Sequence, residues 1–539
     1  MSNSNKNDLT KSDTKDFANA CKYLLSQIKT GQITNYSKLT NYKNKAAKKF
    51  GIGQTPRNSD IIKYASISDL KKFKHLLTKK PSKGLSGVTV VAVMTSPHKC
   101  PGNCIYCPTG FEVDAPKSYT GFEPAARRAR QFNFDPYLQV QNRLSQYTET
   151  NKPVDKIELI IMGGTFLSQP QKFQENFILQ CINAITLKNA KSLKSAKKYA
   201  EVSKNRISGI TFETRPDFCG KKHVNNMLDF GGTRVELGVQ NPDDEIYKII
   251  NRGHTVKDVT SATKNLKDSA FKVAYHLMPG LPSSDRKKDL KNFKMLFQDE
   301  RFQPDMLKIY PCLVMAGTEL YEMYKKKEFK PLTNSQSASL IAEFKKHIPK
   351  YVRVMRIQRD IPANLIAAGT KASNLRQLVS SKMKEKNVKC NCIRCREAGL
   401  KSHLEKINPE NIEITTTEYD ASKGKEIFIA AEDLKKDVLV GFCRLRIPHK
   451  PFRKEITSKT ALIRELHVYS GVVPVGTKPE RPEFQHRGFG KKLLAKAEEI
   501  AVNEFDMKKM TVISGLGVKK YYHALGFRNT GVYVSKTLK

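Results

Sequence analysis

The chain has 539 residues, of which 95 are Lys or Arg and 52 are Asp or Glu, giving a formal net charge of +43. At roughly 100–200 residues per domain, this length predicts about three domains. No run of about 18 apolar residues is present, which excludes a membrane span, and residues 1–15 lack the apolar core of a signal peptide. We therefore expect a cytoplasmic protein. The excess of positive charge suits a nucleic-acid partner with many phosphates to neutralise, although a lysine-rich proteome would also explain it.

The first 85 residues form a basic segment. Residues 1–90 hold 18 Lys and Arg against 5 Asp. Apolar residues recur there at helical spacing, at Phe17, Cys21, Leu24, Leu25 and Ile28. The segment is predicted to be helical, either as a tRNA-binding module or as a solvated extension, and both interpretations stay open.

Residues 86–370 alternate short β-branched runs with helix-like stretches. The runs cover 88–94, 157–162, 210–212, 234–239, 273–277 and 306–310, with a further edge run at 352–357. Alternation of this kind predicts a parallel sheet or barrel, whose active site gathers at the carboxyl ends of the strands. The residues that follow the runs and suit such a site are Gly163, Gly164, Thr165, Glu213 and Gln240.

A cytosolic location keeps thiols reduced, so the eleven cysteines are better interpreted as ligands or core residues than as disulfides. The first cluster, Cys100, Cys104 and Cys107, has C-x3-C-x2-C spacing directly after a predicted strand. Three thiolates can hold three irons of a [4Fe–4S] cluster and leave the fourth iron open for S-adenosylmethionine. The alternative is a zinc knuckle with His98 as fourth ligand.

The neighbours of this cluster favour iron. The aromatic Tyr106 stands where radical-SAM proteins commonly contact the adenine of S-adenosylmethionine. Gly163, Gly164 and Thr165 stand where such enzymes meet its methionine end, since glycines expose backbone to a small ligand.

Residues 371–405 are basic and contain the second cluster, Cys390, Cys392 and Cys395. Three close thiols predict a structural zinc site with Cys312 as the fourth ligand and His403 as the second choice. A second iron–sulfur cluster is the alternative. The isolated Cys21, Cys181, Cys219 and Cys443 are interpreted mostly as small core residues.

Residues 406–539 are predicted to form an α+β domain. Strands are expected at 426–430, 438–445, 462–469 and 510–514, and a helix at about 490–505. The stretch that leads into this helix contains Gln485, Gly488, Phe489, Gly490 and Lys491. Its glycines would present free backbone N–H groups at a helix N-terminus, as the pyrophosphate loop of GNAT-type acetyltransferases does.

Two further segments resemble the GNAT fold. The strand at 462–469, which includes Glu465, Leu466, His467 and Val468, is of the kind that pairs with the pantetheine arm of coenzyme A. Tyr522, with Tyr521 as second choice, stands where a phenol can donate a proton to the coenzyme A sulfur. The alternative is that both tyrosines pack in the core.

Taken together, the chain resembles the catalytic subunit of Elongator in its archaeal or stand-alone form, over about residues 52–539. The stretches that carry this resemblance are GQTPR (53–57), GVTVVAVM (87–94), SYTGFEP (118–124), MGGTF (162–166), FETRPD (212–217), LGVQ (237–240), NRGHT (251–255), QRDIP (358–362) and RELHVY (464–469).

The resemblance implies an α/β fold: a partial (β/α) barrel of radical-SAM type joined to a GNAT-type α+β domain, with a basic helical N-terminal extension. The expected domains are a tRNA-binding region at 1–85, a radical-SAM domain at 86–370, a zinc linker at 371–405 and an acetyl-CoA-binding domain at 406–539.

The resemblance also implies the activity, a carboxymethyluridine synthase that acts on carbon five of the wobble uridine of tRNA. An adenosyl radical would take hydrogen from the acetyl methyl group, the acetyl radical would add to the uracil, and hydrolysis of the thioester would leave the carboxymethyl group. The implied cofactors are a [4Fe–4S] cluster, S-adenosylmethionine, acetyl-CoA and zinc. The implied partners are tRNA, an electron donor for the cluster, and either a second copy or Elongator-like subunits.

The main alternative is a protein lysine acetyltransferase that uses only the C-terminal domain. In that case, substitution of Cys100, Cys104 or Cys107 would leave the activity intact. An RNA-binding scaffold and a methylthiotransferase are further alternatives; the first is disfavoured by two complete cofactor motifs and the second by the acetyl-CoA domain.

Overall fold

The computed structural model describes residues 11–77, 87–108, 114–150, 152–401, 408–469 and 488–539. The chain divides into two units. The first unit is Met1–Leu85 with Leu144–Val154, and the second is Ser86–Arg143 with Asp155–Lys539. Within the described residues, no helix is both long and apolar enough to cross a membrane.

The first unit contains four helices in its N-terminal segment: α1 (Lys11–Lys29), α2 (Tyr36–Lys49), α3 (Asn58–Ile62) and α4 (Ile67–Leu77). Leu24, Ile28 and Leu39 are buried in their shared core. The predicted helical face is therefore largely correct, although Phe17 is only half-buried. Lys22, Lys29 and Lys49 are exposed, and the Lys49 ammonium group lies 4.5 Å from the ring centre of Tyr23.

The barrel of the second unit is a seven-stranded sheet in the order β1-β2-β3-β4-β5-β6-β8. All its neighbouring strands are parallel. The strands are β1 (Thr89–Met94), β2 (Lys156–Met162), β3 (Arg206–Thr214), β4 (Arg234–Gln240), β5 (Lys272–Leu277), β6 (Met306–Ile309) and β8 (Arg353–Ile357). Because each strand is added beside the previous one through a crossover, the sheet forms the open barrel that the alternating sequence predicted.

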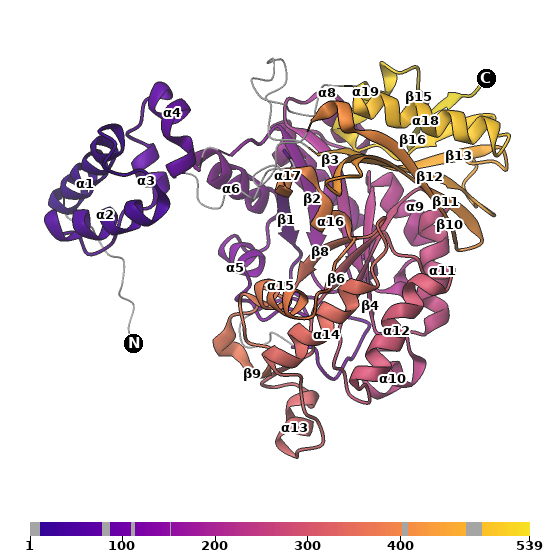
Figure 1. The fold of residues 1–539 in the computed structure, drawn as a ribbon, viewed down its shortest axis with the longest axis horizontal. Helices are drawn as coiled ribbons and strands as arrows, with labels where there is room; N and C mark the ends of the chain where they lie inside the picture. The colour runs from indigo at the N-terminus through magenta and orange to yellow at the C-terminus, as the bar shows by residue number, and fades with distance from the viewer. Residues whose placement is uncertain (1–10, 78–86, 109–113, 151, 402–407, 470–487) are drawn as a thin grey trace. The chain divides into compact units, whose positions relative to one another are not determined.

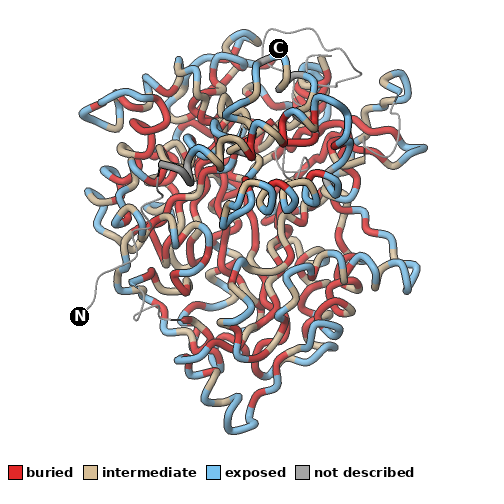
Figure 2. The backbone as a smooth tube through the Cα atoms, turned by 90° about the vertical axis from the view of Figure 1, so that its left-hand side faces the viewer, coloured by how far each residue is buried: buried red, intermediate tan, exposed pale blue. Residues whose placement is uncertain are grey.

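Helices connect the strands of this sheet, and Figure 1 shows α9, α11 and α12 alongside β4 and its neighbours. The helices are α5 (Pro124–Gln131), α6 (Pro136–Glu149), α7 (Gln171–Thr186), α8 (Leu193–Val202), α9 (Lys221–Asp229), α10 (Asp244–Ile249), α11 (Val256–Lys267), α12 (Arg286–Gln298), α13 (Glu319–Lys325) and α14 (Asn334–Lys346). Two short strands, β7 (Leu313–Met315) and β9 (Ile366–Gly369), pair antiparallel outside the barrel. Figure 2 shows that buried residues are concentrated in the interior, whereas many of the outer turns of the tube are exposed.

The C-terminal part holds a second seven-stranded sheet in the order β10-β11-β12-β13-β14-β16-β15. Its strands are β10 (Glu413–Ala421), β11 (Gly424–Asp433), β12 (Val438–Ile447), β13 (Thr460–Val468), β14 (Lys509–Val512), β15 (Arg528–Thr530) and β16 (Tyr533–Thr537). Only β13 and β14 pair in parallel, and their pairing ends at Ile463 and Val512. The helices of this part are α18 (Phe489–Asn503) and α19 (Lys519–His523), while α15 (Leu375–Glu385), α16 (Ile393–Arg396) and α17 (Ala398–Lys401) precede it. The predicted fold class, a partial barrel joined to a GNAT-type α+β domain, is confirmed.

A buried ionic network joins the barrel to the C-terminal sheet. Arg464 of β13 contacts Asp305, which directly precedes β6, and Glu426 of β11. Arg446 of β12 contacts Asp268 at the end of α11, 2.6 Å away. Each of these buried charges has an oppositely charged partner, which offsets the cost of removing it from water. Loss of one partner would leave an unpaired buried charge and destabilise the interface.

Candidate active site

The three cysteines of the first cluster line a pocket at the carboxyl ends of the barrel strands. Cys100, Cys104 and Cys107 lie on the loop after β1, and each is half-buried. Within the described part of the chain, they are not among the groups whose ligand atoms all lie within 4.8 Å of one another. A four-iron cluster holds each thiolate on a different iron, so its ligands lie further apart than those of a single ion. This spacing suits the cluster better than zinc.

Most of the cofactor-binding residues predicted for this site are brought together. Tyr106, Gly164, Thr165, Glu213 and Gln240 all line the same pocket. They arrive from the loop after β1 and from the ends of β2, β3 and β4, because parallel strands end at one edge of the sheet. The Cys100 sulfur lies 3.8 Å from the Thr165 hydroxyl.

Gly163 does not line the pocket but is required next to it. Its φ is +119°, and a Cβ at this position would lie 2.3 Å from the Thr95 hydroxyl. Only glycine allows this close approach of the ends of β1 and β2. Gly163 therefore shapes the loop, and Gly164 is the glycine that faces the cavity.

The local electrostatics distinguish the cysteines. Burial raises the pKa of the Cys104 thiol, but the charge and hydrogen bond of Arg252, with Tyr106 and Arg215, outweigh it and hold that pKa below its ordinary value. Burial raises the pKa of the Cys107 thiol to about 12. The thiol that favours its charged form, the form that binds metal, is therefore the one beside the arginine.

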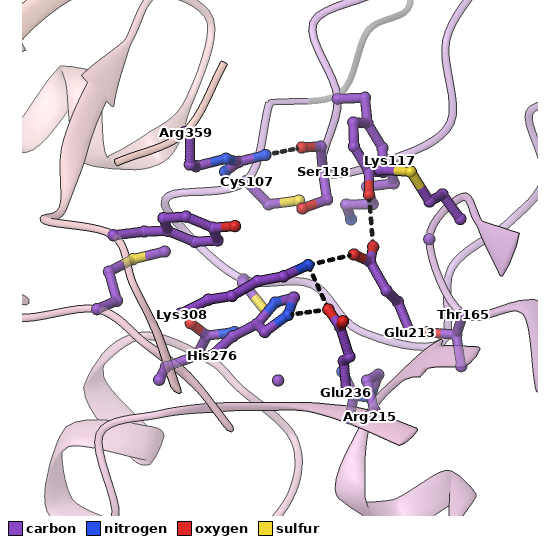
Figure 3. Close-up of a pocket in the computed structure, with 18 of the residues that line it drawn as sticks. Cys107, Lys117, Ser118, Thr165, Glu213, Arg215, Glu236, His276, Lys308 and Arg359 are labelled. Atoms are coloured by element: carbon purple, nitrogen blue, oxygen red, sulfur yellow. Dashed lines mark hydrogen bonds and ion pairs between the residues drawn. The ribbon is translucent and has the colours of Figure 1, made fainter. Parts of the chain in front are cut away.

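A polar cluster that the sequence interpretation largely missed lines the same pocket (Figure 3). Lys308 of β6 lies 3.1 Å from Glu213 and also contacts Glu236 of β4. His276 of β5 lies 2.8 Å from Glu236, and the Tyr119 hydroxyl donates to Glu213. Burial raises the pKa of Glu236, but Lys308 and His276 reverse this and hold it well below its usual range.

Glu213, Glu236 and His276 have ligand atoms close enough for a metal ion. The ammonium group of Lys308 contacts both carboxylates and balances their negative charge in place of a metal ion. The signal in the sequence was a charged side chain inside strands that otherwise read as buried, a pattern that clusters at functional sites.

The second cysteine cluster lies between the barrel and the C-terminal sheet. The ligand atoms of Cys390, Cys392 and Cys395 all lie within 4.8 Å of one another, as ligands of one ion would. The ammonium group of the buried Lys345 lies 3.5 Å from the Cys395 sulfur. Sequence reasoning did not identify this lysine.

Cys312 does not belong to this group. Its backbone N–H donates to Pro279 in the region beyond the carboxyl end of β6. The second cluster instead lies beside Ile393, which donates to Val352 just before the amino end of β8. Because β6 and β8 are parallel neighbours, these positions are at opposite edges of the sheet. The other choice, His403, lies outside the described residues.

The C-terminal domain opens between β13 and β14. The pairing of β13 with β14 ends at Ile463, whereas β13 continues beside β12 to Val468. Glu465, Leu466, His467 and Val468, the residues predicted to meet the pantetheine arm, make up this end of β13. Burial lowers the pKa of His467 to about 4, so its imidazole is neutral at pH 7.

The glycine loop leads into α18 as predicted. Gly488 is the N-cap of α18 with a φ of 80°, and no side chain caps the helix. Phe489 is buried, Lys491 is exposed, and a Cβ on Gly490 would lie 2.8 Å from the Tyr521 hydroxyl. A helix N-terminus of this kind favours an anion through its N–H groups and its dipole. Gln485 lies outside the described residues.

The two predicted catalytic tyrosines differ in burial. Tyr522 is 6% exposed and packs edge-on against Phe527, whereas Tyr521 is 38% exposed. Burial raises the pKa of each phenol, with a further contribution from Cys443 of β12. Cys443 pairs with Leu466, so both tyrosines lie near the end of β13 beyond Ile463.

The fold and the two sites define a radical-SAM protein fused to a GNAT-type acetyltransferase domain. The chain matches the Radical SAM superfamily over residues 94–293, the Radical_SAM C-terminal domain over 304–385, the ELP3 N-terminal domain over 17–85 and the Acetyltransferase (GNAT) family over 397–527. It belongs to the Elongator complex protein 3 family, as its similarity to whole proteins shows.

The similar proteins extend over nearly the whole chain. A tRNA uridine(34) acetyltransferase of Methanocaldococcus infernus is 48% identical over 96% of this chain and 98% of its own length. Elongator complex protein 3 of Schizosaccharomyces pombe is 41% identical over 97% of this chain and 98% of its own length. The solved structure of the archaeal Methanocaldococcus infernus Elp3 with an N-terminal deletion (1–46) matches with a TM-score of 0.76 and 46% identity, covering 84% of this chain and 100% of that chain.

Proposed function

We propose that this protein modifies carbon five of the wobble uridine of tRNA, using S-adenosylmethionine and acetyl-CoA to make a carboxymethyl group. The observation that carries the proposal is the presence, in one unit, of a three-cysteine pocket and of an acetyl-CoA-type fold. Relatives of nearly the same length are named for acetyl transfer to tRNA uridine 34.

The residues of the barrel pocket fit an iron–sulfur cluster and S-adenosylmethionine. Cys100, Cys104 and Cys107 would hold the cluster, which with S-adenosylmethionine supplies one-electron cleavage to a 5′-deoxyadenosyl radical when bound. Gly164 and Thr165 would bind the methionine end of the cofactor through backbone N–H groups and the hydroxyl. Glu213 and Gln240 would accept hydrogen bonds from the ribose, and Tyr106 would contact the adenine.

The C-terminal domain fits acetyl-CoA. The start of α18, with Gly488, Phe489, Gly490 and Lys491, would bind the pyrophosphate, because the dipole of a helix favours an anion at its N-terminus. The end of β13 beyond Ile463, where its pairing with β14 stops, would bind the pantetheine arm through its backbone. Tyr522, or Tyr521 beside it, would donate a proton to the departing sulfur.

We further propose zinc at Cys390, Cys392 and Cys395, where it would fix the linker between the barrel and the C-terminal sheet. The close sulfurs support one ion, and the chain's fourth ligand is left open. Proposed domain limits remain 1–85, 86–370, 371–405 and 406–539.

The proposed partners follow from charge and chemistry. The basic first 85 residues and the lysines of the linker would bind the tRNA backbone. An external electron donor must reduce the cluster. We also propose that the protein binds either a second copy of itself or Elongator-like subunits, and that it acts in the cytoplasm.

The test is anaerobic reconstitution with iron and sulfide, followed by incubation with S-adenosylmethionine, acetyl-CoA and tRNA. We expect 5′-deoxyadenosine and a carboxymethylated uridine, both detected by mass spectrometry. Cys104→Ala should yield neither, whereas Cys181→Ala, a change in the buried face of α7, should yield both.

The same experiment separates the alternative. A protein lysine acetyltransferase would retain its activity in Cys104→Ala and would need no S-adenosylmethionine. Modification of tRNA by Cys104→Ala at the wild-type rate would disprove the proposed function.

A further inference from the structure

The segment Asn-Arg-Gly-His-Thr at 251–255 packs against the first cysteine cluster, and the proposed function gives it no role. It follows α10, and the Ile105 N–H donates to the Ile250 carbonyl 3.2 Å away. The cysteine loop is therefore anchored to the start of this segment, 145 positions later in the chain. Arg252 is the residue of the segment that reaches a cluster ligand.

Arg252 is held between a strand and a cysteine. Its Nη1 lies 3.3 Å from the Cys104 sulfur, and its Nη2 donates to the Gly238 carbonyl of β4 at 2.6 Å. The residue is only 8% exposed. Two contacts on one planar guanidinium fix its direction, which a flexible lysine would not reproduce.

No carboxylate balances this buried charge. The groups that raise the pKa of Arg252 most are Tyr106, Cys104 and Tyr247, and within the described residues no carboxylate forms an ion pair with it. The other buried arginines all have an acidic partner within the described residues: Arg215, Arg234, Arg396, Arg444, Arg446 and Arg464. A buried cation without an anion is costly, so Arg252 requires an anion that the protein side chains do not otherwise supply.

The surroundings leave Cys104 as that anion. His254, two residues on, is buried with no hydrogen-bond partner on either ring nitrogen. Arg215 lies next to the same loop, because a Cβ on Gly102 would lie 1.9 Å from its Nη1, but Arg215 is already paired with Asp217. Arg252 is thus a buried cation that contacts a cysteine of this loop and, within the described residues, forms no ion pair with a carboxylate.

We propose that Arg252 is the counter-ion of cluster ligand Cys104 and that it raises the reduction potential of the iron–sulfur cluster. This inference rests on the proposed function, which puts that cluster on Cys100, Cys104 and Cys107. Reduction adds a negative charge to the cluster. A permanent positive charge and an N–H···S bond at one ligand, away from water, stabilise the reduced form. Arg252 is therefore a positioning residue that makes the cluster easier for the electron donor to reduce.

The test measures the midpoint potential of the reconstituted full-length protein, without S-adenosylmethionine, by titration monitored with electron paramagnetic resonance. Arg252→Gln keeps a hydrogen-bond donor and removes the charge. We expect its potential to fall by about 59 mV, which is a tenfold change in a one-electron equilibrium. The control Lys248→Gln removes the same charge from an exposed position four residues away and should leave the potential unchanged.

A second variant moves the guanidinium without changing any charge. A Cβ on Gly238 would lie 2.6 Å from the Arg252 Nη2, so Gly238→Ala pushes this side-chain end away from its place. We expect a smaller fall of the potential in the same direction. If Arg252→Gln does not fold, Gly238→Ala decides the matter alone.

An unchanged potential in a fully loaded Arg252→Gln protein would overturn the inference. So would a folded Arg252→Gln protein that binds no iron, since Arg252 would then be needed for assembly and not for tuning. A wild-type protein that loads no four-iron cluster would remove the proposed function itself, and this inference with it.

Discussion

Arg464 of β13 donates two hydrogen bonds, of 2.7 Å and 2.6 Å, to the carboxylate of Asp305, and both side chains are fully buried. Asp305 belongs to the barrel and Arg464 to the C-terminal sheet. The pair therefore ties the two catalytic parts of the second unit together. It also lies on the strand that we propose to bind pantetheine, so the acetyl-CoA site and the barrel are mechanically connected.

Asp305→Asn should destabilise the protein by about 3–5 kcal/mol, because it leaves Arg464 and Lys267 short of a buried negative charge. The measurement is urea unfolding of the second unit within the full chain. Asp506→Asn, which removes an exposed partner of Lys459, should have little effect. Equal stability of the two variants would contradict the role given to Asp305.

Acid should destabilise the protein through His467. Its folded pKa of about 4 lies below the unfolded value of about 6.5, so the unfolded chain takes up a proton first as the pH falls. The full stability is present above pH 6.5 and is lost between about pH 6.5 and pH 4. Between pH 7 and pH 5 the loss should be about 2 kcal/mol. In His467→Gln the unfolding free energy should depend less on pH over this interval, and an unchanged dependence would show that His467 is already exposed to water.

Gly488→Ala should weaken acetyl-CoA binding about tenfold, because the N-cap of α18 has a φ of 80° that alanine adopts only with strain of about 1–2 kcal/mol. Gly317→Ala is a matched control, since that glycine has a φ of +77° and open space around it, away from α18. Both variants should lose similar stability in thermal unfolding. Calorimetry with acetyl-CoA should show weaker binding for Gly488→Ala alone.

Tyr522→Phe should slow tRNA modification by about 100-fold if its phenol protonates the sulfur, as general acids commonly contribute at this level. Release of 5′-deoxyadenosine in the absence of acetyl-CoA should be unaffected, because the cluster pocket is separate. Tyr199→Phe, an exposed tyrosine of α8, is the control. Full activity of Tyr522→Phe together with a slow Tyr521→Phe would assign the role to Tyr521.

Metal analysis should find zinc at the second cysteine cluster. Cys390→Ser should lose about one zinc per chain and unfold at a lower temperature, since a structural zinc contributes directly to folding. Cys21→Ser, at a buried position of α1, should keep its zinc. If the wild-type protein instead holds extra iron that is lost in Cys390→Ser, the second cluster is an iron–sulfur cluster.

Local patterns were sufficient wherever a site is made by one short stretch. The Cys100–Cys107 loop, the glycine pair at Gly163 and the helix start at Gly488 each combine their residues within a few positions. Backbone chemistry at these places is set by immediate neighbours, so spacing and residue type could be interpreted directly. Strand and helix alternation likewise predicted the parallel barrel, because that pattern repeats along the chain.

Cys312 shows where this reasoning stops. Cys312 was predicted to be the fourth ligand of the second cluster, but β6 and β8 are parallel neighbours and place it at the other edge of the sheet. Lys345 of α14, more than forty residues before Cys390, lies beside the cluster instead. Sequence spacing says nothing about which edge of a sheet a loop occupies.

The sequence by itself determined the two cofactor motifs, the fold class and the basic character of the first 85 residues, because these depend on local spacing and composition. Only the tertiary structure decided that Arg252 meets Cys104, that Lys308 joins Glu213 and Glu236, and that Arg464 meets Asp305. The physical reason is that these charges belong to different strands and loops, and their pairing depends on how the strands align and which face of each is turned inward. The partner of a charged residue is therefore decided by the fold, which buries the charge next to one particular group.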